Sequence, residues 1–121
     1  ASGEDPLILT GQCETRAFCY VDDAVEATFQ VADHDNCAGE IIHIGNSSEE
    51  ITIGDLAKLV MREMGINRKT NNQGRIPGSV SRRCPNTSKL KELTGFSATV
   101  SLTNGIKRTL PWYLNKKAKV T

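Results

Sequence analysis

Apolar and polar positions near the start of the chain follow the two-residue period of β-strands. Residues 6–10 (PLILT) are mostly apolar and precede Gly11, which predicts a strand that ends in a turn. Residues 15–21 (TRAFCYV) alternate, so Arg16 shares one face with two aromatic side chains and small apolar residues occupy the other. Residues 40–45 (EIIHIG) are an apolar run that predicts a buried strand closed by a glycine.

Two segments follow the helical period instead. The first starts after Asp22 and Asp23 and ends near His34, and Asp23 with Glu26 three residues later resembles a capping box. The second starts after Thr52, a residue type suited to an N-cap, and stops at Gly65. Because adjacent side chains at a strand-to-helix junction point in different directions, we interpret the paired aspartates as helix-starting residues and not as a catalytic or metal-binding pair.

The C-terminal third predicts two further helices. Asn86 is placed to cap a short helix that ends at Gly95, with Leu90 facing inward. The last helix is expected to start from Ser101. Pro111 is expected to interrupt it, because an interior proline removes a hydrogen bond and costs about 3 kcal/mol.

The stretch between these helical regions, residues 66–85, is basic and rich in Asn, Gly and Ser, and it predicts a flexible loop that could hold a short strand. The predicted order β–β–α–β–α–loop–α–α is a mixed α/β (α+β) fold with few short strands and about four helices. It lacks the repeated βαβ units of a complete nucleotide-binding sheet. The length of 121 residues suits one domain, residues 1–121.

Charge divides the chain into two halves. Residues 1–65 hold 3 Lys and Arg against 13 Asp and Glu, a balance of −10, whereas residues 66–121 hold 12 against 1, a balance of +11. The basic half suits a phosphate-bearing ligand or a nucleic acid. The alternative is that both charged halves are solvated surfaces that bind no ligand. Few aromatic residues and no stacking platform argue against nucleic acid.

The four cysteines, at positions 13, 19, 37 and 84, form no C-x-x-C pair and match no zinc spacing, so we expect reduced thiols and no metal. No run approaches the 18 apolar residues of a membrane span, and no secretory leader opens the sequence. These features predict a cytoplasmic protein without a membrane partner.

Three collinear stretches carry a family resemblance. PLILTGQCETRAFCYVDDAVEA, IIHIGNSSEEITIGDLAKLV and RRCPNTSKLKELTGFSATVSLTNGIKRTLPWY resemble the C-terminal, substrate-binding part of extended short-chain dehydrogenases/reductases. These are the NAD-dependent nucleotide-sugar epimerases and dehydratases. Each motif is short, but together they cover about residues 6–117.

The resemblance implies that arginines hold the diphosphate of a nucleotide sugar. It places these contacts at Arg16 and at Arg82 or Arg83, whose planar guanidinium groups match phosphate oxygens. The residues alone leave alternatives open: Arg16 could be an exposed residue on the outer face of its strand, and Arg82 and Arg83 could be surface charge. We expect one of the adjacent pair to bind.

The resemblance also implies what this chain does not supply. It has no glycine-rich NAD turn, and we interpret its one Tyr-x-x-x-Lys spacing, Tyr113 and Lys117, as accidental because it lies in a terminal helix. NAD(P) would therefore be bound by the intact enzyme, a homodimer by analogy, and this chain alone would have no catalytic residue. The alternative is a non-catalytic module whose basic half contacts a nucleic acid or a protein.

Overall fold

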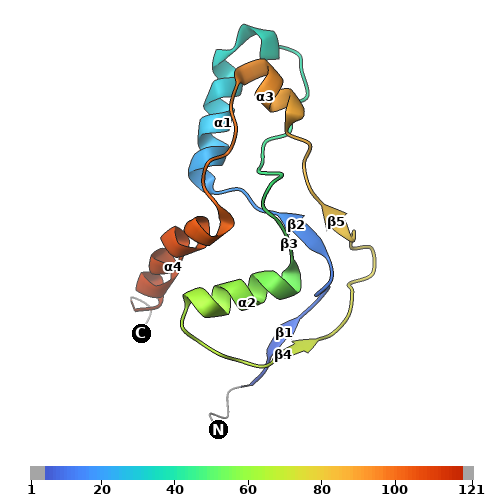
Figure 1. The fold of residues 1–121 in the computed structure, drawn as a ribbon, viewed down its shortest axis with the longest axis vertical. Coiled ribbons are helices and arrows are strands. Elements are labelled where there is room, and N and C mark those ends of the chain that lie inside the picture. Colours follow the sequence, from blue (N-terminus) through green and yellow to red (C-terminus); the bar gives the residue numbers. More distant parts are fainter. Residues whose placement is uncertain (1–4, 119–121) are drawn as a thin grey trace. The chain divides into compact units, whose positions relative to one another are not determined.

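The structure, a computed structural model, describes residues 5–118 (Figure 1). These residues form a mixed α/β fold of short strands and four α-helices, as predicted. The strands are β1 (Leu7–Leu9), β2 (Thr15–Ala17), β3 (Glu50–Thr52), β4 (Thr70–Asn72) and β5 (Arg82–Arg83), and the helices are α1 (Val21–Asp33), α2 (Ile53–Glu63), α3 (Ser88–Thr94) and α4 (Leu102–Ala118), with a 3₁₀ turn, η1, at Asp35–Cys37.

Helix α2 begins and ends where the sequence predicts. The Thr52 hydroxyl accepts a hydrogen bond from the amide of Asp55 at 3.1 Å, which satisfies one of the free N–H groups of the first turn. Gly65 follows the C-cap with a φ of 66°, a left-handed conformation that glycine adopts without a steric penalty.

The predicted capping box at the start of α1 is wrong. The N-cap is Tyr20, and Asp23 lies inside the first turn, where it is buried. Its carboxylate accepts hydrogen bonds from the amides of Thr99 and Val100 at 3.0 and 2.8 Å and from the Thr99 hydroxyl at 3.2 Å. Asp23 therefore has a structural role, as expected of the aspartate pair, but it joins two distant segments and does not cap its own helix.

Two other local predictions are wrong. Residues 40–45 do not form a strand, and Ile41 is 83% exposed. A strand needs a partner for its backbone groups, and no ladder within residues 5–118 includes this segment. Helix α4 continues through Pro111. The carbonyl group that loses its partner there belongs to Lys107, which is exposed, so water can satisfy it.

The basic region 66–85 contains two short parallel strands. Strand β4 pairs with β1, Leu7 lying opposite Thr70, and strand β5 pairs with β2. Strand β2 also pairs with β3, so the order of the second sheet is β3-β2-β5. Both connections return the chain to the segment 7–16, which places the arginines of β5 beside Arg16.

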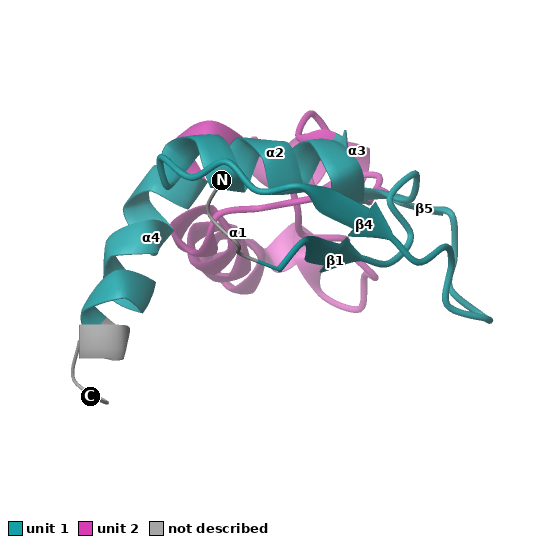
Figure 2. Cartoon of the chain, turned by 90° about the horizontal axis from the view of Figure 1, so that it is seen from below, with its two compact units in different colours: residues 1–16, 51–83, 106–121 teal, residues 17–50, 84–105 magenta. Residues whose placement is uncertain are grey.

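The chain divides into two compact units, coloured separately in Figure 2. Unit 1 comprises residues 1–16, 51–83 and 106–121, and unit 2 comprises residues 17–50 and 84–105. In unit 2, α1 packs against α3, and Ala27, Cys37 and Leu90 are buried there. Among the residues of unit 1 whose burial is described, Leu9 is buried and apolar. Many large apolar side chains are exposed, among them Phe29 at 68%. No helix in the described part of the chain is both long and apolar enough to cross a membrane.

Candidate functional site

The pairing of β2 with β5 brings together two of the predicted binding residues. In this parallel ladder Arg16 lies opposite Arg83, and Thr15 lies opposite Arg82. Residues that are opposite one another in a parallel ladder direct their side chains to the same face of the sheet, and neighbouring strands are about 4.8 Å apart. Arg16 and Arg83 therefore share a face, and Arg82 is directed to the other.

Arg16 is not an exposed residue on the outer face of its strand. Its side chain is 20% exposed and forms an ion pair with Glu14, Nη2 to Oε2, at 2.7 Å. Nη1 donates to the backbone carbonyl of Thr15 at 2.7 Å, and Nη2 also approaches the hydroxyl of Ser79 at 3.4 Å. A guanidinium has five N–H donors, so these three contacts leave donors free for an anion.

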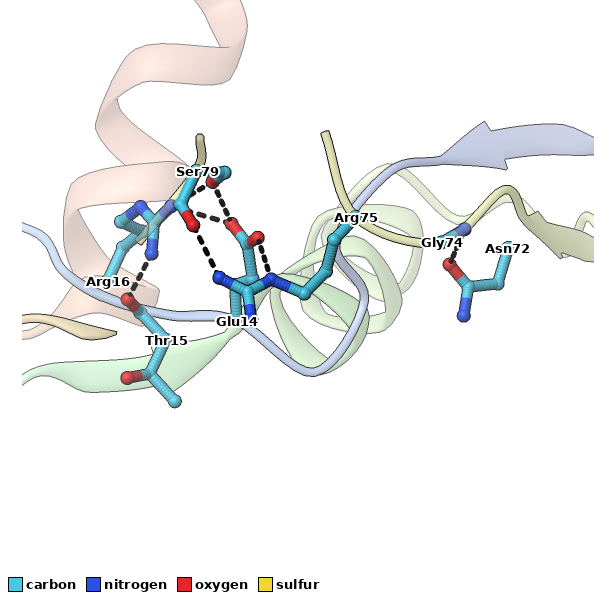
Figure 3. A network of polar contacts seen from close by, with 7 residues as sticks. All are labelled: Glu14, Thr15, Arg16, Asn72, Gly74, Arg75 and Ser79. Atoms are coloured by element: carbon cyan, nitrogen blue, oxygen red, sulfur yellow. Dashed lines mark hydrogen bonds and ion pairs between the residues drawn. The ribbon is translucent and has the colours of Figure 1, made fainter. Parts of the chain in front are cut away.

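Glu14 is the centre of this network, as Figure 3 shows. Its side chain is 7% exposed, and besides Arg16 it accepts a hydrogen bond from the Ser79 hydroxyl at 2.7 Å. Its other oxygen accepts from Nε of Arg75 at 3.2 Å, and Arg75 in turn donates to the carbonyl of Ser79. A buried carboxylate needs such partners, and this one has two cations and a hydroxyl.

These contacts lower the pKa of Glu14. The hydrogen bond from Ser79 has the largest effect, followed by those from Arg75 and Arg16, and together they outweigh the loss of hydration, which raises the pKa. Glu14 is therefore ionised at neutral pH and its charge is available to both arginines.

Sequence reasoning missed Glu14. Arg75 and Ser79 are 61 and 65 residues away in the chain, and no periodicity connects them with it. One signal was present: Glu14 immediately precedes the predicted strand and is two residues from Arg16, a spacing that places side chains on one side of an extended segment.

Together Arg16, Arg75, Arg83 and Glu14 carry a formal charge of +2, three guanidinium groups against one carboxylate. Arg83 is exposed, as is Arg82 on the opposite face. We call this group, Glu14, Arg16, Arg75, Ser79 and Arg83, the arginine cluster. A cluster with excess positive charge and exposed guanidinium donors suits an anion with two or more oxygens.

Unit 2 contains a separate hollow of about 240 Å³, lined mainly by hydroxyl and amide side chains. Its lining includes Asn46, Ser48, Lys91 and Phe96. It contains none of the predicted binding residues.

The described residues do not fit a dinucleotide cofactor. Such a cofactor needs a glycine-rich turn between a strand and a helix N-terminus. Within residues 5–118 the only strand that leads directly into a helix is β3. The glycine there, Gly54, lies inside α2 against Gln12, where a Cβ would be 2.7 Å from a side-chain carbon. Within residues 5–118 no three His, Cys, Asp or Glu side chains gather in a way that could hold a metal ion.

Comparison with known proteins finds relatives that match most of the chain. No protein-family profile matches it. It is 33% identical over 123 residues to UDP-N-acetyl-alpha-D-glucosaminuronate decarboxylase of Bacillus cytotoxicus, covering 92% of this chain and 36% of the relative. It is 35% identical over 114 residues to GDP-L-fucose synthase 1 of Arabidopsis thaliana, covering 93% and 34%. The chain thus spans about a third of the length of the curated relatives it matches.

A solved structure agrees with these relatives. UDP-glucuronic acid 4-epimerase of Bacillus cereus, in complex with UDP-glucuronic acid and NAD, superposes with a TM-score of 0.84 at 28% identity. The match covers 93% of this chain and 36% of the epimerase. UDP-glucose 4-epimerase of Thermotoga maritima, with UDP-glucose, gives a TM-score of 0.83 at 25% identity, over 93% of this chain.

Proposed function

The chain matches the C-terminal part of the extended short-chain dehydrogenases/reductases that act as nucleotide-sugar epimerases and dehydratases, and from this premise we propose that it is the substrate-binding portion of such an enzyme. In this proposal its ligand is a nucleotide sugar, whose diphosphate is held by arginine side chains.

The observation that carries the proposal is the register of β2 and β5. Because Arg16 lies opposite Arg83, two guanidinium groups are available on one face, where a diphosphate with about two negative charges would contact both. The formal charge of the arginine cluster is of the matching size and opposite sign. Of the two adjacent arginines, we assign the contact to Arg83, since Arg82 is directed to the other face.

NAD and the acid–base residues would come from parts of the enzyme outside this chain. When bound, NAD would accept and return the hydride that such reactions move. None of the described residues cradles it, so this chain's contribution is to bind and orient the sugar nucleotide. We expect the 121-residue chain by itself to catalyse no epimerisation or dehydration, and we expect the intact enzyme to be a homodimer.

Calorimetry tests the proposal. The chain is titrated with a UDP-, a GDP-, a CDP- and a dTDP-sugar, and we expect at least one to bind. Arg16→Ala should then lower the affinity by about 1.5–3 kcal/mol, the usual size of a hydrogen bond to a charged group. Arg62→Ala is the matched control, because Arg62 is a 69% exposed arginine of the same unit that pairs with Glu63. Absence of binding to all four ligands would refute the proposal.

A further inference from the structure

Glu14 forms ion pairs with two arginines, and the proposed ligand contacts alone do not require them. Arg16 and Arg83 would supply the positive charge, yet a carboxylate is placed directly between Arg16 and Arg75 (Figure 3). A negative group beside an anion site reduces the local charge, so it needs a compensating role. We propose that Glu14 is a positioning residue, which fixes Arg16 for the diphosphate and ties the loop 73–81 to the start of β2. This inference rests on the proposed function.

The first part of the role is to order the Arg16 side chain. An arginine loses rotamer entropy when its side chain becomes fixed. The Glu14 ion pair at 2.7 Å and the contact with the Thr15 carbonyl hold the guanidinium before any ligand arrives. Binding then costs less conformational entropy, which is the general advantage of a preorganised site.

The second part is to hold the loop that leads to Arg83. Glu14 receives Ser79 Oγ and Arg75 Nε from this loop, and the loop is also bonded through its backbone at both ends. Gly11 N donates to the carbonyl of Gly74 at 2.5 Å, and Thr15 N donates to that of Ser81 at 2.8 Å. Glu14 thus adds side-chain contacts to the loop between two backbone hydrogen bonds, the second of which directly precedes β5.

The backbone near Glu14 leaves space for its carboxylate and fixes its position. Gly11 has a φ of 67°, and a Cβ there would lie 2.7 Å from the carboxyl carbon of Glu14. The amide of Glu14 donates to the Gly11 carbonyl at 2.8 Å, and its carbonyl accepts from Ile53 N at 2.9 Å. A glycine at position 11 therefore leaves room for the side chain, and the backbone bonds fix where it is directed.

Arg75 allows the positioning role of Glu14 to be tested apart from direct contact with the ligand. It is 57% exposed and lies on the far side of Glu14 from Arg16, so it reaches Arg16 through the carboxylate and, more weakly, through Ser79 (Figure 3). If Glu14 positions Arg16 and the loop, removing Arg75 weakens ligand binding, and it does so mainly while Glu14 is present.

The test is a set of mutant cycles on the 121-residue chain, with whichever of the four nucleotide sugars binds wild type most tightly as the probe. We expect Glu14→Ala to weaken affinity about tenfold and Arg75→Ala about threefold, with Glu14→Ala/Arg75→Ala no weaker than Glu14→Ala alone. In an Arg16→Ala background, Glu14→Ala should lose the part of its effect that acts through Arg16, so its fold-change should be clearly smaller than in wild type. A merely structural defect would persist in that background.

Two controls match the chemistry. Glu63→Ala removes another little-exposed carboxylate with two cationic partners, Arg62 and Lys107, and Arg62→Ala removes an exposed arginine; both should keep wild-type affinity. Should Glu14→Ala not fold by circular dichroism, Arg75→Ala and Glu14→Gln carry the test, because neither removes the side chain from the interior. Glu14→Gln is expected to weaken binding as Glu14→Ala does.

The outcomes distinguish the two claims. If no nucleotide sugar binds wild type, the proposed function fails and this inference fails with it. If wild type binds and Arg16→Ala weakens binding, but Arg75→Ala and the Glu14 variants bind as wild type does, only the positioning role of Glu14 is overturned.

Discussion

Arg16 on β2 and Arg83 on β5 lie opposite one another in a parallel ladder, although they are 67 positions apart in the sequence. The neighbouring Arg82 lies opposite Thr15 instead. Adjacent arginines that sequence alone cannot rank are therefore directed to opposite faces of the sheet, and only one of them shares a face with Arg16.

This difference predicts unequal effects of two similar substitutions. Arg83→Ala should weaken nucleotide-sugar binding on the order of tenfold, the scale of one charged hydrogen bond, whereas Arg82→Ala should weaken it less. Calorimetry at a fixed salt concentration measures both, and each variant loses the same charge. A larger loss in Arg82→Ala would show that the assignment to Arg83 is wrong.

Stability should depend on the ionisation of Glu14. Its pKa is lowered in the folded chain, so it contributes stability that is fully present above its unfolded pKa of about 4.3 and is lost as the pH falls through the lower folded value. Urea unfolding of wild type and Glu14→Gln at pH 7 and at lower pH should give a free-energy difference that favours wild type at pH 7 and shrinks below about pH 4.

Glu92→Gln is the control for this titration, since Glu92 is an exposed carboxylate on α3. Its difference from wild type should be close to zero throughout. A Glu14→Gln difference that does not change with pH would contradict the role assigned to the Glu14 charge.

Asp22 and Asp23 should differ sharply in their contribution to stability. Asp23→Ala removes the buried carboxylate that accepts from the amides of Thr99 and Val100 and should lower the free energy of unfolding by about 2–3 kcal/mol. Asp22 is exposed in the first turn of the same helix, so Asp22→Ala should change it by only about 0.5 kcal/mol. Denaturant unfolding of the pair checks this, and equal effects would be inconsistent with the observed bonds.

Leu90 is the large apolar side chain that unit 2 buries most completely, at 1% exposure. Leu90→Ala should destabilise the fold by about 2–5 kcal/mol, because it removes apolar contacts and leaves a cavity. Leu114→Ala makes the same chemical change at a 53% exposed position on α4 and should cost about 0.5 kcal/mol or less. Similar losses in thermal unfolding would mean that Leu90 is not a core residue.

Sequence was sufficient where local chemistry determines structure. Thr52 immediately precedes α2 and Gly65 follows its C-cap, as predicted, and Gly95 ends α3 with a φ of 74°. Caps can be predicted because they depend on residues that are close together in the sequence. The start of α4 after Ser101 follows from the same kind of signal.

It was insufficient where structure depends on distant partners. Residues 40–45 have the composition of a strand but pair with no strand in the described part of the chain, and composition cannot reveal that. Asp23 resembles a cap, yet it bonds residues 76 and 77 positions away. The candidate site shows the same division: the arginines were found through a family resemblance, whereas Glu14 became visible only when the loop 73–81 was placed beside it.

The central claim is that this chain recognises the diphosphate of a nucleotide sugar. Its most direct test is calorimetric titration with UDP-glucuronic acid or whichever of the other nucleotide sugars binds best, in parallel with the corresponding nucleoside and free sugar, which lack the diphosphate. We expect saturable binding of the intact nucleotide sugar, weakened by rising salt and by Arg16→Ala, and much weaker binding of the two fragments that lack the diphosphate. Equal binding of nucleoside and nucleotide sugar, or an affinity unchanged in Arg16→Ala/Arg83→Ala, would contradict it.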